Sequence, residues 1–134
     1  MIALALCSML EAAAADYVIV VDEEVEEQSF TKKDLRKVLS RQSCCWGGGI
    51  EVALIFPPDE EDAMSWLLEG FVGLEPEVYR RYLMERCYRM GCVPMVGAPD
   101  LETAHEVASR TPGALTIAEV GDIPEGMKVI SIID

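Results

Sequence analysis

The residues with the greatest chemical potential in this sequence are two dense groups of carboxylates. Asp59, Glu60, Glu61 and Asp62 follow a pair of prolines, and a second acidic group spans 22–27. Clustered carboxylates can bind calcium, but neither group has the spaced Asp, Asn and Gly pattern of a preorganised calcium loop. Carboxylates in the first turn of a helix also complement its dipole, by about 0.3 to 1 kcal/mol each when exposed. We therefore expect weak calcium binding at most, and no metal site.

Side chains that could catalyse a reaction are few. His105 is the only histidine, and it stands beside Glu106 in a segment with helical periodicity. A lone helical histidine more often fills a surface or a core, and a cysteine nucleophile would need this same histidine as its base. The glycine run 47–49 lacks the Lys-Ser/Thr pair of a nucleotide-binding loop. The sequence favours a binding protein over an enzyme and predicts no cofactor.

The cysteines indicate disulfides. Of five cysteines, Cys7 lies in the apolar start of the chain, and Cys44, Cys45, Cys87 and Cys92 remain. An even number is typical of disulfides in an exported protein, and four cysteines allow three pairings. Because a bond between adjacent cysteines strains the peptide between them, we predict a link from Cys44 or Cys45 to Cys87 or Cys92. Their spacing does not fit zinc, and buried free thiols are the alternative.

Residues 1–15 have the features of a signal peptide. The stretch 1–10 is mostly apolar, and the alanines at 13–15 supply the small residues that a signal peptidase requires before Asp16. The stretch contains no Lys or Arg, and a short buried strand or helix is the alternative interpretation. We predict cleavage after Ala15 and a periplasmic or secreted bacterial protein, with residues 16–134 as its one domain.

The charge of the chain excludes some partners. It carries 24 acidic and 11 basic side chains, a formal net charge of -13, and its basic residues are scattered. Such a surface repels the phosphate backbone of a nucleic acid. No apolar run reaches the roughly 18 to 20 residues that a membrane span needs. We expect no nucleic-acid binding and no membrane span.

Hydrophobic periodicity predicts strands that alternate with helices. Strands are expected where apolar and β-branched residues cluster or alternate, and helices where apolar residues recur between a capping residue and a glycine or proline. This alternation predicts an α/β fold with a mixed, mostly parallel sheet flanked by helices. The predicted strands are 17–21, 50–56, 93–96, 114–118 and 128–133, and the helices are capped or opened by Thr31, Asp59, Pro76 and Asp100.

Several short motifs occur in this same order. The clearest is Thr-Pro-Gly-Ala-Leu at 111–115, and the chain closes with Pro-Glu-Gly-Met-Lys-Val-Ile at 124–130. Together they resemble the PBP-like domain of phosphate ABC transporter substrate-binding proteins, in its short single-domain form. The resemblance covers about residues 16–134 and implies a lobe of the type II periplasmic-binding-protein architecture. Weaker matches are the Thr31 helix with Leu35-Arg36, the turn from Trp46 to Ile50, Phe71 to Leu74, and Tyr79 and Tyr82 before Gly91 and Pro94.

The resemblance also implies a ligand site. The family's anion loop, which follows the strand matching 50–56, typically carries Ser, Gly, Thr and often Arg, and backbone N–H groups at helix N-termini help to hold the anion. In this chain the corresponding residues are Pro58, Asp59, Glu60, Glu61 and Asp62. Four carboxylates therefore stand where an anion would bind. The Gly-Tyr pair that follows the family's Thr-Pro-Gly motif is likewise replaced, by Thr116-Ile117.

Two functions follow from these observations. The first is an exported solute-binding-like protein for phosphate or another small anion, which would work with a membrane transporter or another protein partner. The second is an interaction module that kept the fold and lost the anion pocket. For either function we predict weak or no binding of phosphate, because like charges a few ångströms apart in a partly dry site repel strongly.

Overall fold

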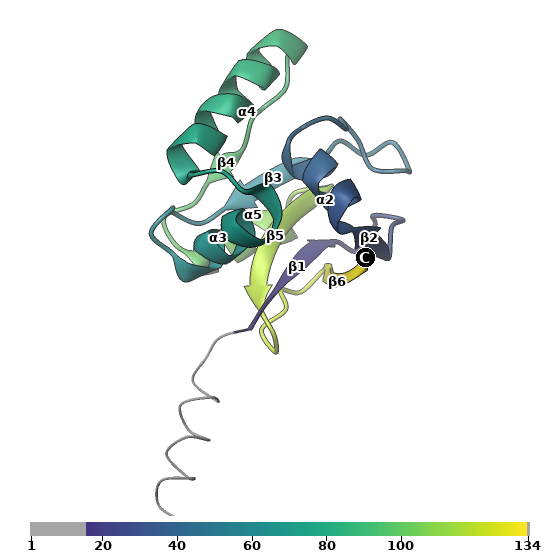
Figure 1. Cartoon of the computed structure of the whole chain (residues 1–134). Coiled ribbons are helices and arrows are strands. Elements are labelled where there is room, and N and C mark those ends of the chain that lie inside the picture. Colours follow the sequence, from purple (N-terminus) through teal and green to yellow (C-terminus); the bar gives the residue numbers. More distant parts are fainter. Residues whose placement is uncertain (1–15, 134) are drawn as a thin grey trace, which may run out of the picture.

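The structure is a computed structural model that describes residues 16–133 (Figure 1). The predicted signal peptide at 1–15, with its cleavage site, lies outside the described residues. In chain order the elements are β1 (Tyr17–Asp22), β2 (Ser29–Thr31), α2 (Lys32–Leu39), β3 (Ala53–Phe56), α3 (Asp62–Leu67), the π-helix η1 (Leu68–Val72), α4 (Pro76–Met90), β4 (Val96–Gly97), α5 (Leu101–Ser109), β5 (Ala114–Glu119) and β6 (Met127–Ile133).

The strands form one six-stranded sheet in the order β2-β6-β1-β5-β3-β4. The pairs β2–β6, β3–β5 and β3–β4 are parallel, whereas β1 runs antiparallel to both of its neighbours, β5 and β6. Ile19 in β1 lies opposite Ile117 on one side and Ile130 on the other. The predicted fold class, a mixed and mostly parallel sheet flanked by helices, is confirmed.

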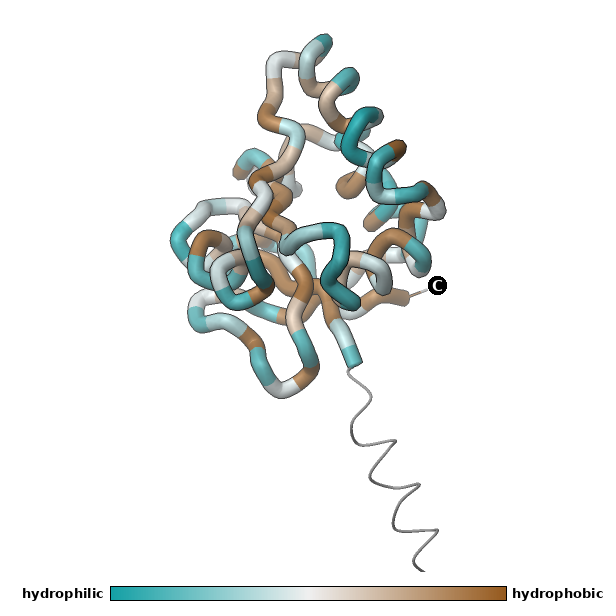
Figure 2. The backbone as a smooth tube through the Cα atoms, turned by 90° about the vertical axis from the view of Figure 1, so that its left-hand side faces the viewer, coloured by the Kyte–Doolittle hydropathy of each residue, from teal (hydrophilic) through white to brown (hydrophobic). Residues whose placement is uncertain are grey.

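Alternation along the strands gives the sheet two buried faces. Ile19 and Val21 belong to the larger core, which also contains apolar side chains of α2, α3 and α4. Val20 points to the opposite face, where Ala104 and Ala108 of α5 cover the sheet. Small alanine side chains let α5 approach the strands closely. Figure 2 shows the apolar strands gathered within the body of the molecule, where full burial of a large apolar side chain contributes about 1.5 to 3 kcal/mol.

The helix boundaries follow local signals in most cases. The Thr31 hydroxyl accepts a hydrogen bond from Asp34 N at 3.0 Å, and Asp100 Oδ1 accepts one from Thr103 N at 2.7 Å. Both residues are the N-caps that the sequence predicts. The predicted cap at Asp59 is wrong: α3 begins at Asp62, and its N-cap Glu61 forms no side-chain capping bond. The carboxylate of Asp59 bonds to Arg80 instead.

Strand boundaries depart further from the prediction. β2 was not predicted, because a three-residue strand leaves no periodicity to detect. The predicted strand 50–56 has regular pairing only from Ala53, with Glu51 in an isolated bridge to Cys45. The predicted strand 93–96 starts only at Val96. The carbonyl of Val93 accepts a hydrogen bond from the Arg41 side chain and joins no described ladder.

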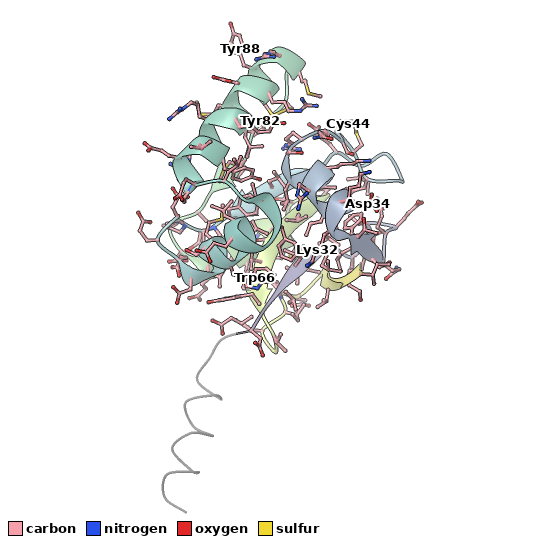
Figure 3. All side chains as sticks on the ribbon, viewed as in Figure 1. Lys32, Asp34, Cys44, Trp66, Tyr82 and Tyr88 are labelled. Carbon is pink, nitrogen blue, oxygen red and sulfur yellow. A yellow bond between two sulfur atoms is a disulfide. The ribbon has the colours of Figure 1, made fainter. Side chains whose placement is uncertain are left out.

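Helix α4 extends away from the sheet (Figure 1). Its attachments include the Tyr79 hydroxyl, which donates to Leu39 O at 2.7 Å, and Arg86 Nε, which donates to Arg41 O at 2.8 Å. Tyr88 is 90% exposed and projects from the outer part of this helix (Figure 3). No described helix combines the length and the apolar character that crossing a membrane requires.

Candidate functional site

The five residues predicted to form an anion loop lie together on the turn between β3 and α3. This turn, Pro58–Asp62, follows the carboxyl end of β3, and Glu61 N donates to Pro58 O at 3.1 Å. Glu60 and Asp62 are exposed, and the other three residues are half-buried. The structure thus brings the four carboxylates together on one turn.

One of these carboxylates is already paired. Asp59 Oδ2 forms an ion pair with Arg80 Nη2, from α4. The two side chains keep 26% and 46% of their exposure, so water screens the pair. Because the guanidinium of Arg80 is engaged by Asp59, it does not offset the charge of the other three carboxylates.

The electrostatic field beside the turn is negative. Tyr17 lies opposite Glu119 at the end of the β1–β5 ladder. Partial burial raises the pKa of the Tyr17 hydroxyl, and the charges of Asp62, Glu119 and Glu61 raise that pKa further. Each of these carboxylates disfavours a second negative charge at this place. An anion approaching the turn meets the same repulsion.

Aromatic rings adjoin these carboxylates. The rings of Tyr17 and Trp66 are 5.8 Å apart, and Trp66 contacts Phe71 edge-on at 5.3 Å. All three side chains are half-buried, and Figure 3 labels Trp66 on α3. We call Tyr17, Glu61, Asp62, Trp66 and Glu119 the acidic–aromatic surface. Its chemistry suits a cation, because both carboxylates and ring faces attract positive charge.

The Thr-Pro-Gly motif lies at the opposite, amino end of β3 and β5. Gly113 N donates to Asp22 Oδ2 at 2.8 Å, and Gly113 O accepts from Trp46 Nε1 at 2.8 Å and from Ala53 N at 3.0 Å. Its φ is +74°, and a Cβ there would lie 2.1 Å from Glu51 O. Only glycine fits this position. The motif joins three segments of the chain and has a packing role.

Sequence reasoning missed Arg41, which lies near this same amino end. Its side chain is buried, with Nη1 donating to Val52 O at 2.6 Å and Nη2 donating to Val93 O at 2.5 Å. Burial lowers the pKa of the guanidinium, and the charge of Glu51 opposes that shift. The polar run 40–43 indicates only an exposed loop, so no local pattern identifies a buried cation here.

The predicted disulfide pairing is wrong. Cys44 bonds to its neighbour Cys45, and Cys87 bonds to Cys92, so no disulfide joins the two segments. The second pairing follows from the end of α4, where Gly91 adopts a left-handed conformation with φ +74°. That turn reverses the chain and brings the Cα atoms of Cys87 and Cys92 to 4.6 Å, within the range for a disulfide.

His105 has a structural role in the fold. Its Nε2 lies 2.8 Å from Ile117 O, a contact that joins α5 to β5. The glycine run 47–49 is likewise engaged locally, since Gly47 N donates to Glu27 Oε2 at 2.9 Å. Both features thus make contacts within the fold.

Comparison with solved structures places this arrangement among known folds. The crystal structure of PstS from Borrelia burgdorferi aligns with 88% of this chain at 14% identity and a TM-score of 0.67. An ABC-type phosphate transport receptor from Vibrio cholerae aligns with 88% of it at 13% identity and a TM-score of 0.58. The chain shares the fold of the matching part of each receptor.

The likeness is one of fold and not of sequence. This chain spans about half the length of each receptor, 47% of the Borrelia burgdorferi chain and 46% of the Vibrio cholerae chain. No protein-family model and no curated protein matches the sequence. The resemblance predicted from the Thr-Pro-Gly motif and the element order is therefore confirmed at the level of the fold.

Proposed function

We propose that this chain is an exported solute-binding-like protein, related to the phosphate-binding components of ABC transporters, that binds its ligand without transforming it. The observation that carries the proposal is the turn 58–62, which lies at the carboxyl end of β3 in a fold shared with two phosphate receptors. Ligands of open α/β sheets bind outside the carboxyl ends of the strands. The proposed ligand is phosphate or another small anion, delivered to a membrane transporter, and we expect the carboxylates of the turn to weaken its binding.

Free phosphate is a poor ligand for this turn. A dianion requires hydrogen-bond donors, each contributing about 1.5 to 3 kcal/mol when charge-assisted. Here Glu61 N is bonded to Pro58 O, and Arg80 is engaged by Asp59. The remaining side-chain oxygens are acceptors. We therefore expect phosphate to bind the purified chain weakly or not at all.

Titration calorimetry of the purified chain with phosphate and sulfate tests this expectation. A turn variant, Glu60→Ser/Glu61→Gly/Asp62→Thr, removes three charges and supplies hydroxyl groups. A control variant, Glu23→Ser/Glu24→Gly/Glu26→Thr, makes the same change of charge in the other acidic segment. We expect the turn variant to bind phosphate about tenfold more tightly than the control, equivalent to about 1.4 kcal/mol.

Two outcomes would contradict the proposal for the turn. Micromolar binding of phosphate by the unaltered chain would mean that the carboxylates point away from the anion. Equal affinity of the turn and control variants would mean that only net charge matters, and that the turn has no specific role.

A second candidate function is an interaction module, and the acidic–aromatic surface favours it. Carboxylates beside partly exposed rings suit a partner surface rich in Lys or Arg. An oligolysine peptide should change the fluorescence of Trp66. This change should become smaller as salt is added, because salt screens the attraction between the charges. The variant Glu61→Gln/Asp62→Asn should lose this response, whereas Trp66→Phe identifies the responding ring. If Glu61→Gln/Asp62→Asn still shows the same change in fluorescence with oligolysine, this function is contradicted.

Export is tested separately. Mass spectrometry of the chain produced with an export system should find an N-terminus at Asp16, after the alanines at 13–15. An intact Met1 on exported material would contradict the proposed signal peptide, and intact protein retained in the cytoplasm would contradict the periplasmic or secreted location.

A further inference from the structure

Arg41 occupies a backbone position that ordinarily favours glycine. Helix α2 ends in a Schellman motif, in which Arg41 N donates to Val38 O at 3.2 Å and Gln42 N donates to Lys37 O at 2.9 Å. The residue that makes this reversal has φ +60°, and it is the one non-glycine residue with positive φ among those described. A residue other than glycine costs about 1 kcal/mol or more there. An unfavourable backbone conformation directs attention to what the side chain does.

The guanidinium of Arg41 is a buried cation without a carboxylate partner. The residue is 3% exposed, and no described carboxylate forms an ion pair with it. Its two hydrogen bonds go to the neutral carbonyls of Val52 and Val93, and Nε has no partner among the described residues. Buried arginines are ordinarily paired or fully hydrogen-bonded, because desolvation of an unpaired charge is costly.

A cavity adjoins this guanidinium. It has a volume of about 280 Å³, and Arg41 and Glu51 form its polar wall. Its other walls are mainly apolar and include Val52 just before β3, Val93 and Met95 after α4, and Val96 of β4. A smaller hollow of about 130 Å³ shares Arg41 and Glu51 as lining residues.

We propose that this cavity, the Arg41 cavity, binds a small monocarboxylate with an apolar body. The guanidinium supplies a positive charge beside the cavity, and its Nε–H has no partner among the described residues. The apolar walls match a short hydrocarbon chain or a ring, and the volume limits the ligand to a small molecule. The cavity lies at the amino end of β3, away from the turn 58–62, so this proposal is independent of the phosphate titration.

The charge of Glu51 should weaken the binding of a carboxylate in this cavity. It lines the cavity, and its charge acts on Arg41 without an ion pair between the two side chains. A bound carboxylate would be repelled by Glu51 while it is attracted by Arg41. Glu51→Gln removes the repulsion, and because Glu51 is exposed this variant keeps the fold. We expect it to bind the carboxylate three- to tenfold more tightly.

The experiment is a titration of the ¹⁵N-labelled full chain with hexanoate, followed by NMR of the Arg41 Nε–H signal and of the backbone amides of β3. Hexanol serves as the uncharged ligand of similar shape. Val96→Trp fills the cavity from its apolar wall without altering Arg41, and Val120→Trp is the control at another exposed valine. We expect hexanoate to shift the Nε–H signal, and Val96→Trp to weaken its binding at least tenfold.

Four results would overturn the proposal. They are an unmoved Nε–H signal at saturating hexanoate in solution, equal binding of hexanol, unchanged affinity in Glu51→Gln, and unchanged affinity in Val96→Trp. Inorganic phosphate that competes with hexanoate at equal concentration would overturn the assignment to a carboxylate. A signal that hexanoate moves and hexanol does not, together with the expected responses of the Val96 and Glu51 variants, would establish the site.

Discussion

The two ends of the parallel strands β3 and β5 differ in burial and in hydrogen bonding. At the amino end, Arg41, Trp46 and Gly113 are buried and hydrogen-bonded to main-chain atoms of distant segments. At the carboxyl end, the turn 58–62 carries exposed or half-buried carboxylates, one of them in a screened ion pair. We therefore expect substitutions at the amino end to destabilise the fold more than substitutions at the carboxyl end.

This difference bears on which residues carry the resemblance predicted from the sequence. The Thr-Pro-Gly motif lies at the amino end, and packing explains its glycine. The acidic turn lies at the carboxyl end, where function is expected to vary on a fixed scaffold. A fold can thus be recognised from a glycine whose role is packing.

The largest expected effect at the amino end comes from Gly113→Ala. The new Cβ would lie 2.1 Å from Glu51 O, at a φ of +74°. Left-handed backbone and overpacking together should reduce the free energy of unfolding by about 3 kcal/mol, measured by urea denaturation. Gly121→Ala is the matched control, since φ there is +91° with no atom within 4 Å of the Cβ. Equal losses in the two variants would mean that the contact with Glu51 is unimportant.

Arg41→Met should have the next largest effect. It removes the donors to the buried Val52 O and to the partly buried Val93 O. A buried carbonyl left without a partner costs about 1 to 3 kcal/mol, and a partly buried one costs less. Loss of the unpaired charge offsets part of this cost. We expect the free energy of unfolding to fall by about 2 to 4 kcal/mol. An unchanged urea midpoint would show that the guanidinium does not hold these segments together.

Tyr79→Phe tests the attachment of α4 next to the amino end. Removing the buried hydroxyl, which donates to Leu39 O, should cost about 1 kcal/mol near neutral pH. Burial raises the pKa of Tyr79 above its ordinary value, and the charge of Arg41 opposes that shift. Burial thus favours the neutral hydroxyl in the folded state. The contribution of Tyr79 to the stability of the folded chain is therefore complete below about pH 10, and it is lost as the pH rises further.

The pH dependence gives this prediction a second measurement. Above about pH 10, ionisation of Tyr79 in the unfolded state should lower the stability of the unaltered chain by up to about 1.4 kcal/mol per pH unit. The phenylalanine variant lacks this contribution. The difference in stability between the two proteins should therefore narrow as the pH rises. If the difference in stability between the two proteins does not change with pH, the hydroxyl of Tyr79 is in contact with solvent.

The smallest effect is expected at the carboxyl end, from Arg80→Met. The Arg80–Asp59 pair is partly exposed, and ion pairs that water reaches contribute about 0 to 1 kcal/mol. The loss should disappear in high salt, unlike the loss in Arg41→Met. If Arg80→Met destabilised the chain as much as Arg41→Met, the contrast between the two ends would be wrong.

Local signals in the sequence account for much of the fold. Thr31 and Asp100 begin helices because their side chains can cap them, and Gly91 ends α4 because it adopts positive φ. Alternation in β1 and β3 predicts which side chains face each core. Such features depend on neighbours within a few positions, so one sequence is enough to predict them.

Contacts between distant segments account for the errors. Asp59 fails to cap α3 because Arg80, from α4, binds its carboxylate. Arg41 becomes a buried cation because Val93 lies beside it in space, 52 positions away in sequence. The sequence predicts that residues 58–62 form an acidic turn after a strand. The ion pair of Asp59 and the Arg41 cavity depend on tertiary structure, which local patterns do not encode.

The position of β1 has a consequence for the order of folding. This first described strand is central in the sheet, and both of its neighbours, β5 and β6, come from the last part of the described chain. During synthesis, β1 emerges long before either partner exists, and its apolar residues remain uncovered. Pairings between distant segments also close slowly, because a long loop must be ordered first. The nascent chain therefore stays unfolded and open to chaperones until β6 has been made.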